Sequence, residues 1–336
     1  MIARTLSRLQ PEGWQRELAE GYRLPSELLA ALGLDPDLPG VDLNPGNPFP
    51  QRVPLSYVRR MRHGDPGDPL LRQVLPLLAE RESPPAGYVR DPVGDLASER
   101  APGVLHKYHG RALLITTGAC AVHCRYCFRR HYPYGDAMHA EDEWQEALEA
   151  IAGAEDLTEV ILSGGDPLSL ANHRLAALID RLEMLPRLRR LRLHTRLPVV
   201  LPSRVDEALT GLLANTRLKP VVVIHANHPA EIDDEVRRAL ARLAAAGATL
   251  LNQSVLLRGV NDDAGVLAEL SEALFDAGVT PYYLHLLDRV AGAAHFEVEP
   301  EKAKEIHRSL RGVLPGYLVP RLVREEPGAD AKTPVL

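Results

Sequence analysis

The sequence predicts an α/β fold in which parallel strands are covered by helices. From residue 101 onward, six short apolar runs alternate with stretches of amphipathic helical pattern. The runs are apolar along their whole length, as expected of parallel strands that are buried on both faces. Six such units suit either an open, partial barrel or a doubly wound sheet, and the pattern alone does not decide between them. The predicted strands are Ala112–Thr116, Val160–Leu162, Leu191–Thr195, Val221–His225, Thr249–Val255 and Tyr282–Leu287.

The stretches between these strands carry apolar residues at spacings of three and four, which is typical of helices packed on one face. Gly247 and Gly278 stand where the C-terminal caps of two such helices are expected. Residues 1–100 differ, because short helical patterns there are interrupted by loops rich in proline and glycine. We therefore divide the chain into an N-terminal helical region (residues 1–100), the α/β core (residues 101–300) and a C-terminal helix with a tail (residues 301–336).

Composition disfavours several classes of function. The formal net charge of −6 is spread along 336 residues, so nucleic-acid binding through bulk positive charge is not expected. No apolar run approaches the length of a membrane span, and residues 1–15 lack the apolar core of a signal peptide. Because the cysteines are clustered and no export signal is visible, we expect a protein of the reducing cytoplasm with no membrane partner.

All three cysteines lie in one loop, where Cys120, Cys124 and Cys127 are spaced C-x3-C-x2-C. A structural zinc site normally needs four protein ligands. A four-iron, four-sulfur cluster has four irons, and thiolates are its usual ligands. Three cysteines would leave one iron of such a cluster without a protein ligand and therefore open for chemistry. The spacing alone is also compatible with an incomplete zinc site or with buried, inert thiols.

Polar residues gather at the carboxyl ends of the predicted strands. In parallel α/β folds, binding and catalytic sites are built at these ends. Any one of these residues alone is expected to be a loop cap or a solvated side chain. However, polar residues occur at the end of every predicted strand. The sequence therefore predicts one large, shared site. Its members are the cysteine loop, Ser163–Asp166, His194–Arg196, His225–His228, Asn252–Ser254, His285 and Asp288.

The cysteine motif, with Tyr126 before its third cysteine, resembles the signature of the radical S-adenosylmethionine enzymes. The segment Phe128-Arg129-Arg130 that follows narrows the resemblance to the lysine 2,3-aminomutase family. Within that family the chain most resembles the short bacterial form that makes (R)-β-lysine for the modification of elongation factor P. The resemblance covers residues 55–336 through segments in the same order and spacing, namely Asp68–Pro76, His106–Arg111, Ser163–Pro167, Arg196–Val200, Asn252–Arg258, Pro281–Tyr283, Gly292–Phe296 and Lys332–Pro334.

The resemblance implies a partial (βα)6 barrel with a helical lead-in and a short C-terminal segment that carries pyridoxal phosphate. It implies that the three cysteines bind a [4Fe–4S] cluster whose fourth iron is chelated by S-adenosylmethionine. Glycine in the segment after the second strand would allow the backbone to approach the methionine end of that molecule. The residues implied as contacts to the cluster or to S-adenosylmethionine are Ser163, Gly164, Gly165, Asp166, Tyr126 and His225.

The resemblance assigns Lys332 as the residue that binds pyridoxal phosphate covalently, although by position alone it would be a frayed terminal lysine. A lysine is a nucleophile only when it is deprotonated, which burial favours. Arg111 and Gln253 align with contacts to the phosphate and ring of this cofactor. His285 stands where the longer, fermentative relatives carry a tyrosine, so a flat ring is kept against the cofactor.

The resemblance also implies how the substrate, L-lysine, is bound. Arg129 aligns with the arginine that takes the α-carboxylate, and Asp288 and Glu325 align with two acids that take the ε-ammonium group. Glu325 is one methylene longer than the family's aspartate, so the charge is kept while the geometry shifts. Two acids argue against glutamate as the substrate but not against arginine. The implied reaction is migration of the α-amino group of L-lysine to Cβ.

The implied partners are a reductant such as flavodoxin or ferredoxin and a β-lysyl ligase that acts on elongation factor P. Zinc is not expected, because the zinc-binding C-terminal extension of the longer relatives has no counterpart here. The sequence does not fix the oligomeric state, and a homo-oligomer is compatible with it. Two other functions stay open: an aminomutase that supplies free β-amino acid from lysine or arginine, and a non-catalytic iron–sulfur protein.

Overall fold

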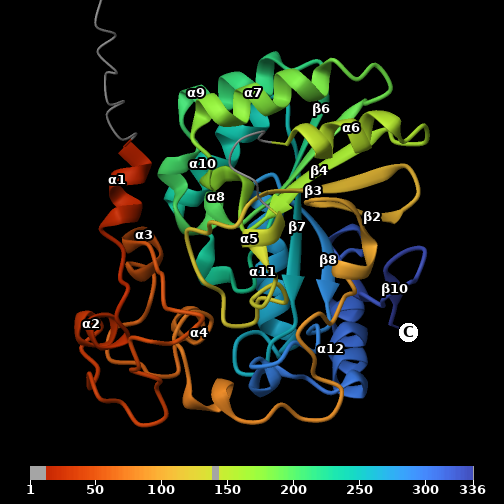
Figure 1. Ribbon diagram of the computed structural model, residues 1–336. Helices are drawn as coiled ribbons and strands as arrows, with labels where there is room; N and C mark the ends of the chain where they lie inside the picture. Colours follow the sequence, from red (N-terminus) through yellow and green to blue (C-terminus); the bar gives the residue numbers. More distant parts are fainter. Residues whose placement is uncertain (1–12, 138–143, 336) are drawn as a thin grey trace, which may run out of the picture.

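The structure is a computed structural model that describes residues 13–137 and 144–335. Its central feature is one sheet of ten strands whose spatial order equals their order in the chain (Figure 1). The six strands that the sequence predicts are consecutive in this sheet and parallel to one another. These are β3 (Arg111–Thr117), β4 (Glu159–Gly164), β5 (Arg190–Thr195), β6 (Lys219–Ile224), β7 (Thr249–Val255) and β8 (Thr280–His285).

The sequential strand order decides between the two predicted architectures. A doubly wound sheet reverses its strand order at a switch point, and the strands of the described chain contain no such reversal. Right-handed crossovers between strands placed in sequence put the connecting helices on one face, which lets the sheet curl around its other face. The core is therefore a partial barrel, and the fold that the resemblance implied is confirmed.

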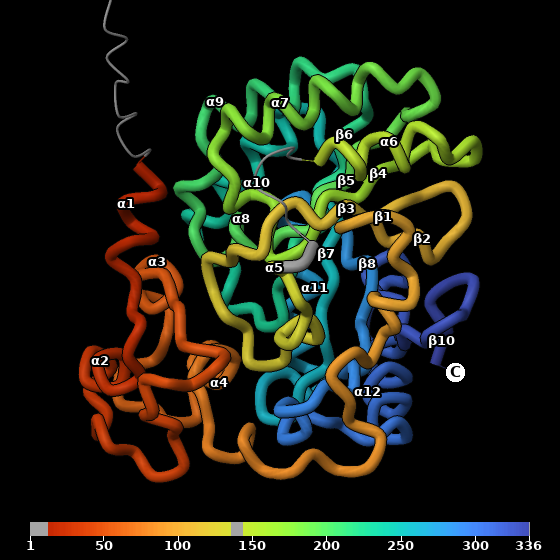
Figure 2. Tube along the Cα trace, viewed as in Figure 1, coloured from red at the N-terminus to blue at the C-terminus, as the bar shows by residue number. Residues whose placement is uncertain are grey.

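Helices cover the outer face of the curled sheet (Figure 2). Asp206, Asp233 and Asp263 each precede one of them and accept a hydrogen bond from a backbone N–H of its first turn. Gly247 and Gly278 follow two of them with φ of +84° and +75°, as predicted for C-terminal caps. The helices of the core are α5 (Tyr134–Ala137), α6 (Gln145–Gly153), α7 (Asn172–Glu183), α8 (Leu197–Val200), α9 (Glu207–Asn215), α10 (Asp234–Ala245) and α11 (Ala264–Asp276), and the C-terminal helix is α12 (Pro300–Val313).

The two faces of the sheet differ in burial. On β5, Leu191 and Leu193 are fully buried beneath the helices, whereas Arg192 and His194 on the other face keep part of their surface accessible. The strand β7 shows the same alternation, with Leu250 buried and its neighbours at 251, 253 and 255 partly exposed. In a complete eight-stranded barrel the inward face is packed with side chains. Here the inward side chains of β5 and β7 retain accessible surface, which leaves them free to contact a bound molecule.

Four short strands extend the sheet beyond the predicted six, and the sequence analysis missed them. At one edge, β1 (Glu99–Ala101) and β2 (Val104–Tyr108) are antiparallel additions to β3. At the other edge, β9 (Arg321–Arg324) is parallel to β8, and β10 (Thr333–Pro334) pairs with β9 in the antiparallel sense. The two edges meet, because Tyr108 Oη donates a hydrogen bond to Glu325 Oε1 at 2.5 Å. Side chains thus join the edges along a seam, which we call the sheet seam.

The N-terminal region packs beside the barrel as a set of short helices joined by long loops (Figure 1). Trp14, Leu28, Tyr57 and Leu70 from this region belong to the same buried cluster as the helix-facing side of the sheet. Within the described ranges, no helix combines the length and the apolar character that crossing a membrane requires. The helices of this region are α1 (Gly13–Ala19), α2 (Pro25–Ala31), α3 (Leu55–Val58) and α4 (Pro69–Arg72).

Candidate active site

The cysteine loop lies between β3 and α5 and is anchored by the N-terminal region. Arg125, in the middle of the motif, is fully buried and donates from Nε to Glu80 Oε1 at 2.9 Å. Arg130 donates to the other oxygen of Glu80 at 2.6 Å. Burial raises the pKa of Glu80, but the two arginines outweigh burial and bring the pKa below its ordinary value. One buried carboxylate therefore fixes the two arginines that flank Cys127.

The three thiols of the loop are partly buried. Burial raises the pKa of Cys120 well above its ordinary value, and the neighbouring Cys127 adds to the rise. Burial also raises the pKa of Cys127 to about 11, with Cys124 adding to the rise. These two thiols are therefore protonated without a metal, and a bound metal would favour their thiolate forms.

Arg196 presents a buried positive charge to the same loop. Its Nη1 donates to Cys124 Sγ at 2.8 Å, and its Nη2 donates to Gln73 Oε1 at 2.7 Å and to Glu231 Oε2 at 3.1 Å. A buried guanidinium suits an anionic cluster, whose potential depends on hydrogen bonds to its sulfur ligands. In the described part of the chain, no three His, Cys, Asp or Glu side chains converge as ligands of one metal ion do. A [4Fe–4S] cluster holds its thiolates on separate irons, so the three cysteines fit it without such convergence.

Gly164 and Gly165 bring the end of β4 against the cysteine loop. A Cβ on Gly165 would lie 2.4 Å from Ala119 O, and a Cβ on Gly164 would lie 2.6 Å from Thr117 O. The φ of Gly164, +117°, also favours glycine over other residues. Glycine is thus required at both positions for the packing of the strand end on the loop. A direct role toward S-adenosylmethionine stays a prediction.

Asp166 and Tyr126, which are predicted cofactor contacts, are both engaged by protein groups. Asp166 accepts from Thr195 Oγ1 at 2.7 Å and from the backbone N–H of Arg196 at 2.7 Å, which joins the ends of β4 and β5. Burial raises the pKa of Asp166 to about 6 although these hydrogen bonds lower it. Tyr126 Oη accepts from Asn227 Nδ2 at 2.7 Å. These side chains hold the loop and the strand ends in place, and any contact with a cofactor would be an additional one.

Polar side chains form a row around the inward face at the carboxyl ends of β4 to β8. Residues that are paired in a parallel register share a face, as do residues two apart on one strand. The register of these strands therefore puts Ser163 and His194 on the same face, and it puts His225 and Gln253 there as well. The register between β7 and β8 adds His285. We call these five residues the strand-end row.

The three histidines of the strand-end row each have an Nε2 atom without a hydrogen-bond partner in the described part of the chain. Burial lowers the pKa of His225 to about 4 and lowers the pKa values of His194 and His285 well below the ordinary value. All three rings are therefore neutral at pH 7. A buried polar atom left unpaired costs about 1–3 kcal/mol. These nitrogen atoms consequently mark positions where a bound molecule would complete the hydrogen bonding.

A chain of alternating charges crosses the sheet seam. Arg129 Nε contacts Asp95 Oδ2 at 2.7 Å, and Lys107 Nζ contacts Asp95 Oδ1 at 2.7 Å. Lys107 Nζ also lies 3.9 Å from Glu325 Oε1, and Lys332 Nζ lies 2.6 Å from Glu325 Oε2. None of these side chains is more than 21% exposed. Arg129 and Glu325, which are predicted to take opposite ends of the substrate, thus belong to one charge network.

Asp288 lies just after β8 at this seam. Burial raises its pKa to about 7, an increase that Lys332 opposes and Glu325 enlarges. Near neutral pH the carboxyl group is therefore only about half ionised. A cation that arrives beside it would favour the ionised form.

Lys332 is placed at the seam by β10, in which Thr333 pairs with Arg324. Its Nζ lies 5.7 Å from the centroid of the Tyr283 ring, and that ring packs against His285 at 5.6 Å. On the opposite edge, the Arg111 guanidinium lies 4.6 Å from the centroid of the Tyr108 ring. A lysine beside flat rings, with an arginine across the seam, fits a flat aldehyde that carries a phosphate. The C-terminal tail is therefore part of the sheet and not a frayed end.

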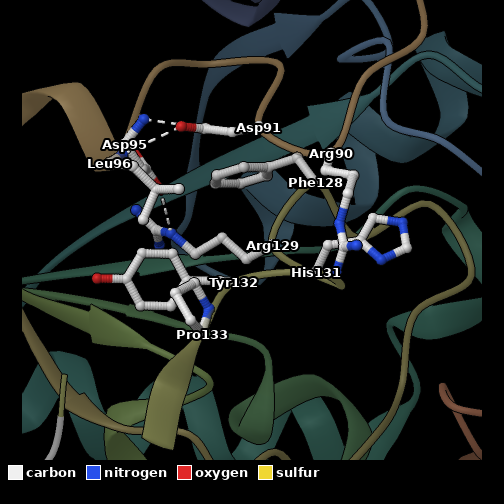
Figure 3. A pocket seen from close by; sticks show the side chains of 9 residues that line it. All are labelled: Arg90, Asp91, Asp95, Leu96, Phe128, Arg129, His131, Tyr132 and Pro133. Atoms are coloured by element: carbon white, nitrogen blue, oxygen red, sulfur yellow. Dashed lines mark hydrogen bonds and ion pairs between the residues drawn. The ribbon is translucent and has the colours of Figure 1, made fainter. Parts of the chain in front are cut away.

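A pocket of about 290 Å³ adjoins Arg129 (Figure 3). The Arg129 guanidinium lies 4.8 Å from the centroid of the Phe128 ring and donates from Nη1 to Ser163 Oγ at 3.0 Å. Asp91 accepts from the backbone N–H groups of Asp95 and Leu96, both at 3.0 Å, and thereby fixes the segment that carries Asp95. Arg129 thus connects this pocket to the strand-end row.

Sequence reasoning missed Glu80, Asp95 and Lys107 as parts of the site. Asp95 lies in a stretch rich in proline and glycine, Glu80 lies just before that stretch, and the arginine partners of Glu80 and Asp95 are 45 and 34 residues away in the chain. Lys107 lies in a segment that carries the family resemblance, which is the only signal that could have singled it out.

Comparison with known proteins gives consistent matches. A family model described as "Radical SAM superfamily" matches residues 114–270. The L-lysine 2,3-aminomutase of Escherichia coli (strain K12) is 49% identical over 334 residues, which cover 98% of this chain and 96% of that protein. The L-lysine 2,3-aminomutase of Haemophilus influenzae is 46% identical over 96% of each chain. That of Clostridium subterminale is 37% identical over 83% of this chain and 67% of that protein.

Proposed function

The chain belongs to the L-lysine 2,3-aminomutase family of radical S-adenosylmethionine isomerases, and on this basis we propose how its residues divide the reaction. The substrate is L-lysine, whose α-amino group moves to Cβ. The observation that carries the proposal is the charge network of the sheet seam, with Arg129 at one end and Glu325 and Lys332 at the other. When bound, the reduced cluster with S-adenosylmethionine supplies a radical that removes hydrogen, and pyridoxal phosphate supplies a carbonyl group for the migrating nitrogen.

Cys120, Cys124 and Cys127 would hold the [4Fe–4S] cluster and leave one iron for S-adenosylmethionine. Arg196 supports this role by its hydrogen bond to Cys124 Sγ, since a cation beside a thiolate ligand favours the more negative, reduced cluster. Glu80 keeps the loop in one shape by holding the arginines that flank Cys127.

Lys332 would bind pyridoxal phosphate, with Arg111 toward the phosphate and His285 and Gln253 toward the ring. The short contact with Glu325 aims Lys332 Nζ into the seam before the cofactor arrives. A cofactor held by Lys332 would take up the nitrogen that now contacts Glu325. That carboxylate would then be available to another ammonium group, such as the distal end of lysine.

The two ends of the substrate meet opposite charges. Arg129 would take the α-carboxylate, and Glu325 with Asp288 would take the ε-ammonium group. The negative charge of Glu325 and Asp288 favours a substrate with a cationic side chain and disfavours glutamate. Burial of all these groups strengthens the discrimination, because charges in a poorly solvated site interact more strongly.

We further propose that the product is (R)-β-lysine, that a β-lysyl ligase transfers it to elongation factor P, and that flavodoxin or ferredoxin supplies the electron. Support comes from the motif segments shared with the short bacterial subgroup. It also comes from the identities, which are 49% with the Escherichia coli relative and 37% with the Clostridium subterminale relative.

The proposal is tested by anaerobic incubation of the reconstituted protein with S-adenosylmethionine, pyridoxal phosphate, dithionite and one amino acid at a time. L-Lysine, L-arginine and L-glutamate form the panel, and chiral chromatography identifies the products. We expect β-lysine from L-lysine, predominantly the R isomer, and no product from L-glutamate. Product from L-arginine but not from L-lysine would contradict the substrate assignment, and an S product would contradict the subgroup assignment.

A further inference from the structure

One member of the strand-end row has no assigned partner. Ser163 contacts Arg129, whereas His225, Gln253 and His285 are expected to face cofactors. His194 stands between Ser163 and His225 on the same face, at the end of β5. Its ring packs edge to face against that of His225 at a centroid distance of 6.0 Å. Its Nε2 is buried and has no partner in the described part of the chain.

The substrate carboxylate is the group that this position best serves. Two of the three nitrogen atoms of Arg129 are already engaged, Nε by Asp95 and Nη1 by Ser163. The Nε edge of Arg129 is therefore occupied, and its remaining N–H groups at Nη1 and Nη2 point to a carboxylate from one side only. A donor from a neighbouring strand end would give the carboxylate a further contact. The next strand end beyond Ser163 carries His194.

We propose that His194 is a further substrate-binding residue, whose Nε2–H donates a hydrogen bond to the α-carboxylate held by Arg129. This inference rests on the proposed function, because it takes lysine as the molecule in the site. The ring is neutral, since burial, helped by His225 and by nearby cations that include Lys332, lowers the pKa of His194. A neutral donor adds a contact without adding a third positive charge between Arg129 and Lys332.

The test compares two ligands on protein loaded with cluster and pyridoxal phosphate. L-Lysine carries the carboxylate, whereas cadaverine is the same diamine without it. Binding of each is followed through the absorbance of the pyridoxal phosphate chromophore, with no turnover required. His194→Phe keeps the ring and its packing on His225 but removes the donor. We expect lysine affinity to fall at least about tenfold in His194→Phe while cadaverine affinity stays unchanged.

Two variants make the result specific. His194→Gln returns an N–H donor near the original Nε2 position and should recover part of the lysine affinity. His225→Phe removes the neighbouring unpaired Nε2 and should leave the lysine-to-cadaverine ratio unchanged. Equal losses for both ligands in His194→Phe, or no loss for either, would overturn the inference. Failure of the unsubstituted protein to change absorbance with either amine would instead refute the proposed function.

Discussion

Asp288→Asn should remove a pH dependence from the recognition of lysine. Burial raises the pKa of Asp288 to about 7 in the presence of the opposing Lys332 charge. Because an ammonium group binds the ionised carboxylate, affinity should improve as the pH rises through this pKa. The ionised fraction grows from about one tenth at pH 6 to about nine tenths at pH 8, so the gain should be about tenfold. Binding of the cofactor to Lys332 removes the opposing charge and shifts the midpoint upward.

The assay is the ratio of the dissociation constants of L-norleucine and L-lysine, measured from the absorbance of the bound cofactor. Norleucine has the same α-amino and carboxylate groups but no ε-ammonium group, so pH effects at the α end cancel. The ratio should rise at least about tenfold from pH 6 to pH 8 in the unsubstituted protein, since the bound cofactor shifts the midpoint above 7, and it should stay flat in Asp288→Asn. A flat ratio in the former, or the same slope in both, would refute the reasoning.

Glu325→Gln is the matched control for this prediction. It lowers the ratio at every pH because one acceptor of the ammonium group is lost. The slope remains, and its midpoint moves to lower pH because Glu325 helps to raise the pKa of Asp288.

The raised pKa of Asp288 also makes the stability of the protein depend on pH. Between about pH 4 and pH 7 the native carboxyl group holds a proton that the unfolded chain has released, so its contribution to the free energy of unfolding decreases as the pH rises.

Three further substitutions separate the cofactors from the scaffold. Lys332→Ala should abolish turnover and the covalent pyridoxal phosphate chromophore while cluster absorbance persists, and normal turnover would contradict its role. Cys124→Ala should lose both the cluster, measured as iron content, and the activity; retention of about four irons per chain would count against the assigned ligand set. Glu80→Gln leaves the buried Arg125 and Arg130 without their anionic partner and should cost about 3–5 kcal/mol in denaturant unfolding. A loss below about 1 kcal/mol would show that the loop has another anchor.

The six parallel strands could be predicted because each contains a short apolar run that stands between stretches of amphipathic helical pattern, even where one face keeps accessible side chains, as on β5 and β7. The edge strands β1 and β2 could not, because residues 99–108 include charged residues, a proline and a glycine that are also typical of loops. The strands β9 and β10 are short, and β10 has only two residues. Their existence depends on neighbouring strands supplied by the fold and not on local pattern.

The residues of the site also differ in whether they could be predicted from the sequence. Residues whose chemistry is distinctive, such as the clustered cysteines and the histidines at strand ends, could be found from type and position. Glu80, Asp95 and Lys107 could not, because an ordinary surface residue type gains its role only when the fold brings a partner from a distant segment. Lys332 could be identified as a site residue only through the family resemblance. The structure adds the reason for its position, which is the pairing of β10 with β9.

The central claim is that one site grips both ends of lysine while its amino group migrates within the same molecule. Incubation of the fully reconstituted protein with L-lysine labelled with ¹⁵N at the α position, in the presence of unlabelled ammonium, tests it most directly. The account predicts β-lysine that carries the label at Cβ without dilution. β-Lysine with unlabelled nitrogen at Cβ, or no β-lysine from protein that holds both the cluster and pyridoxal phosphate, would contradict it.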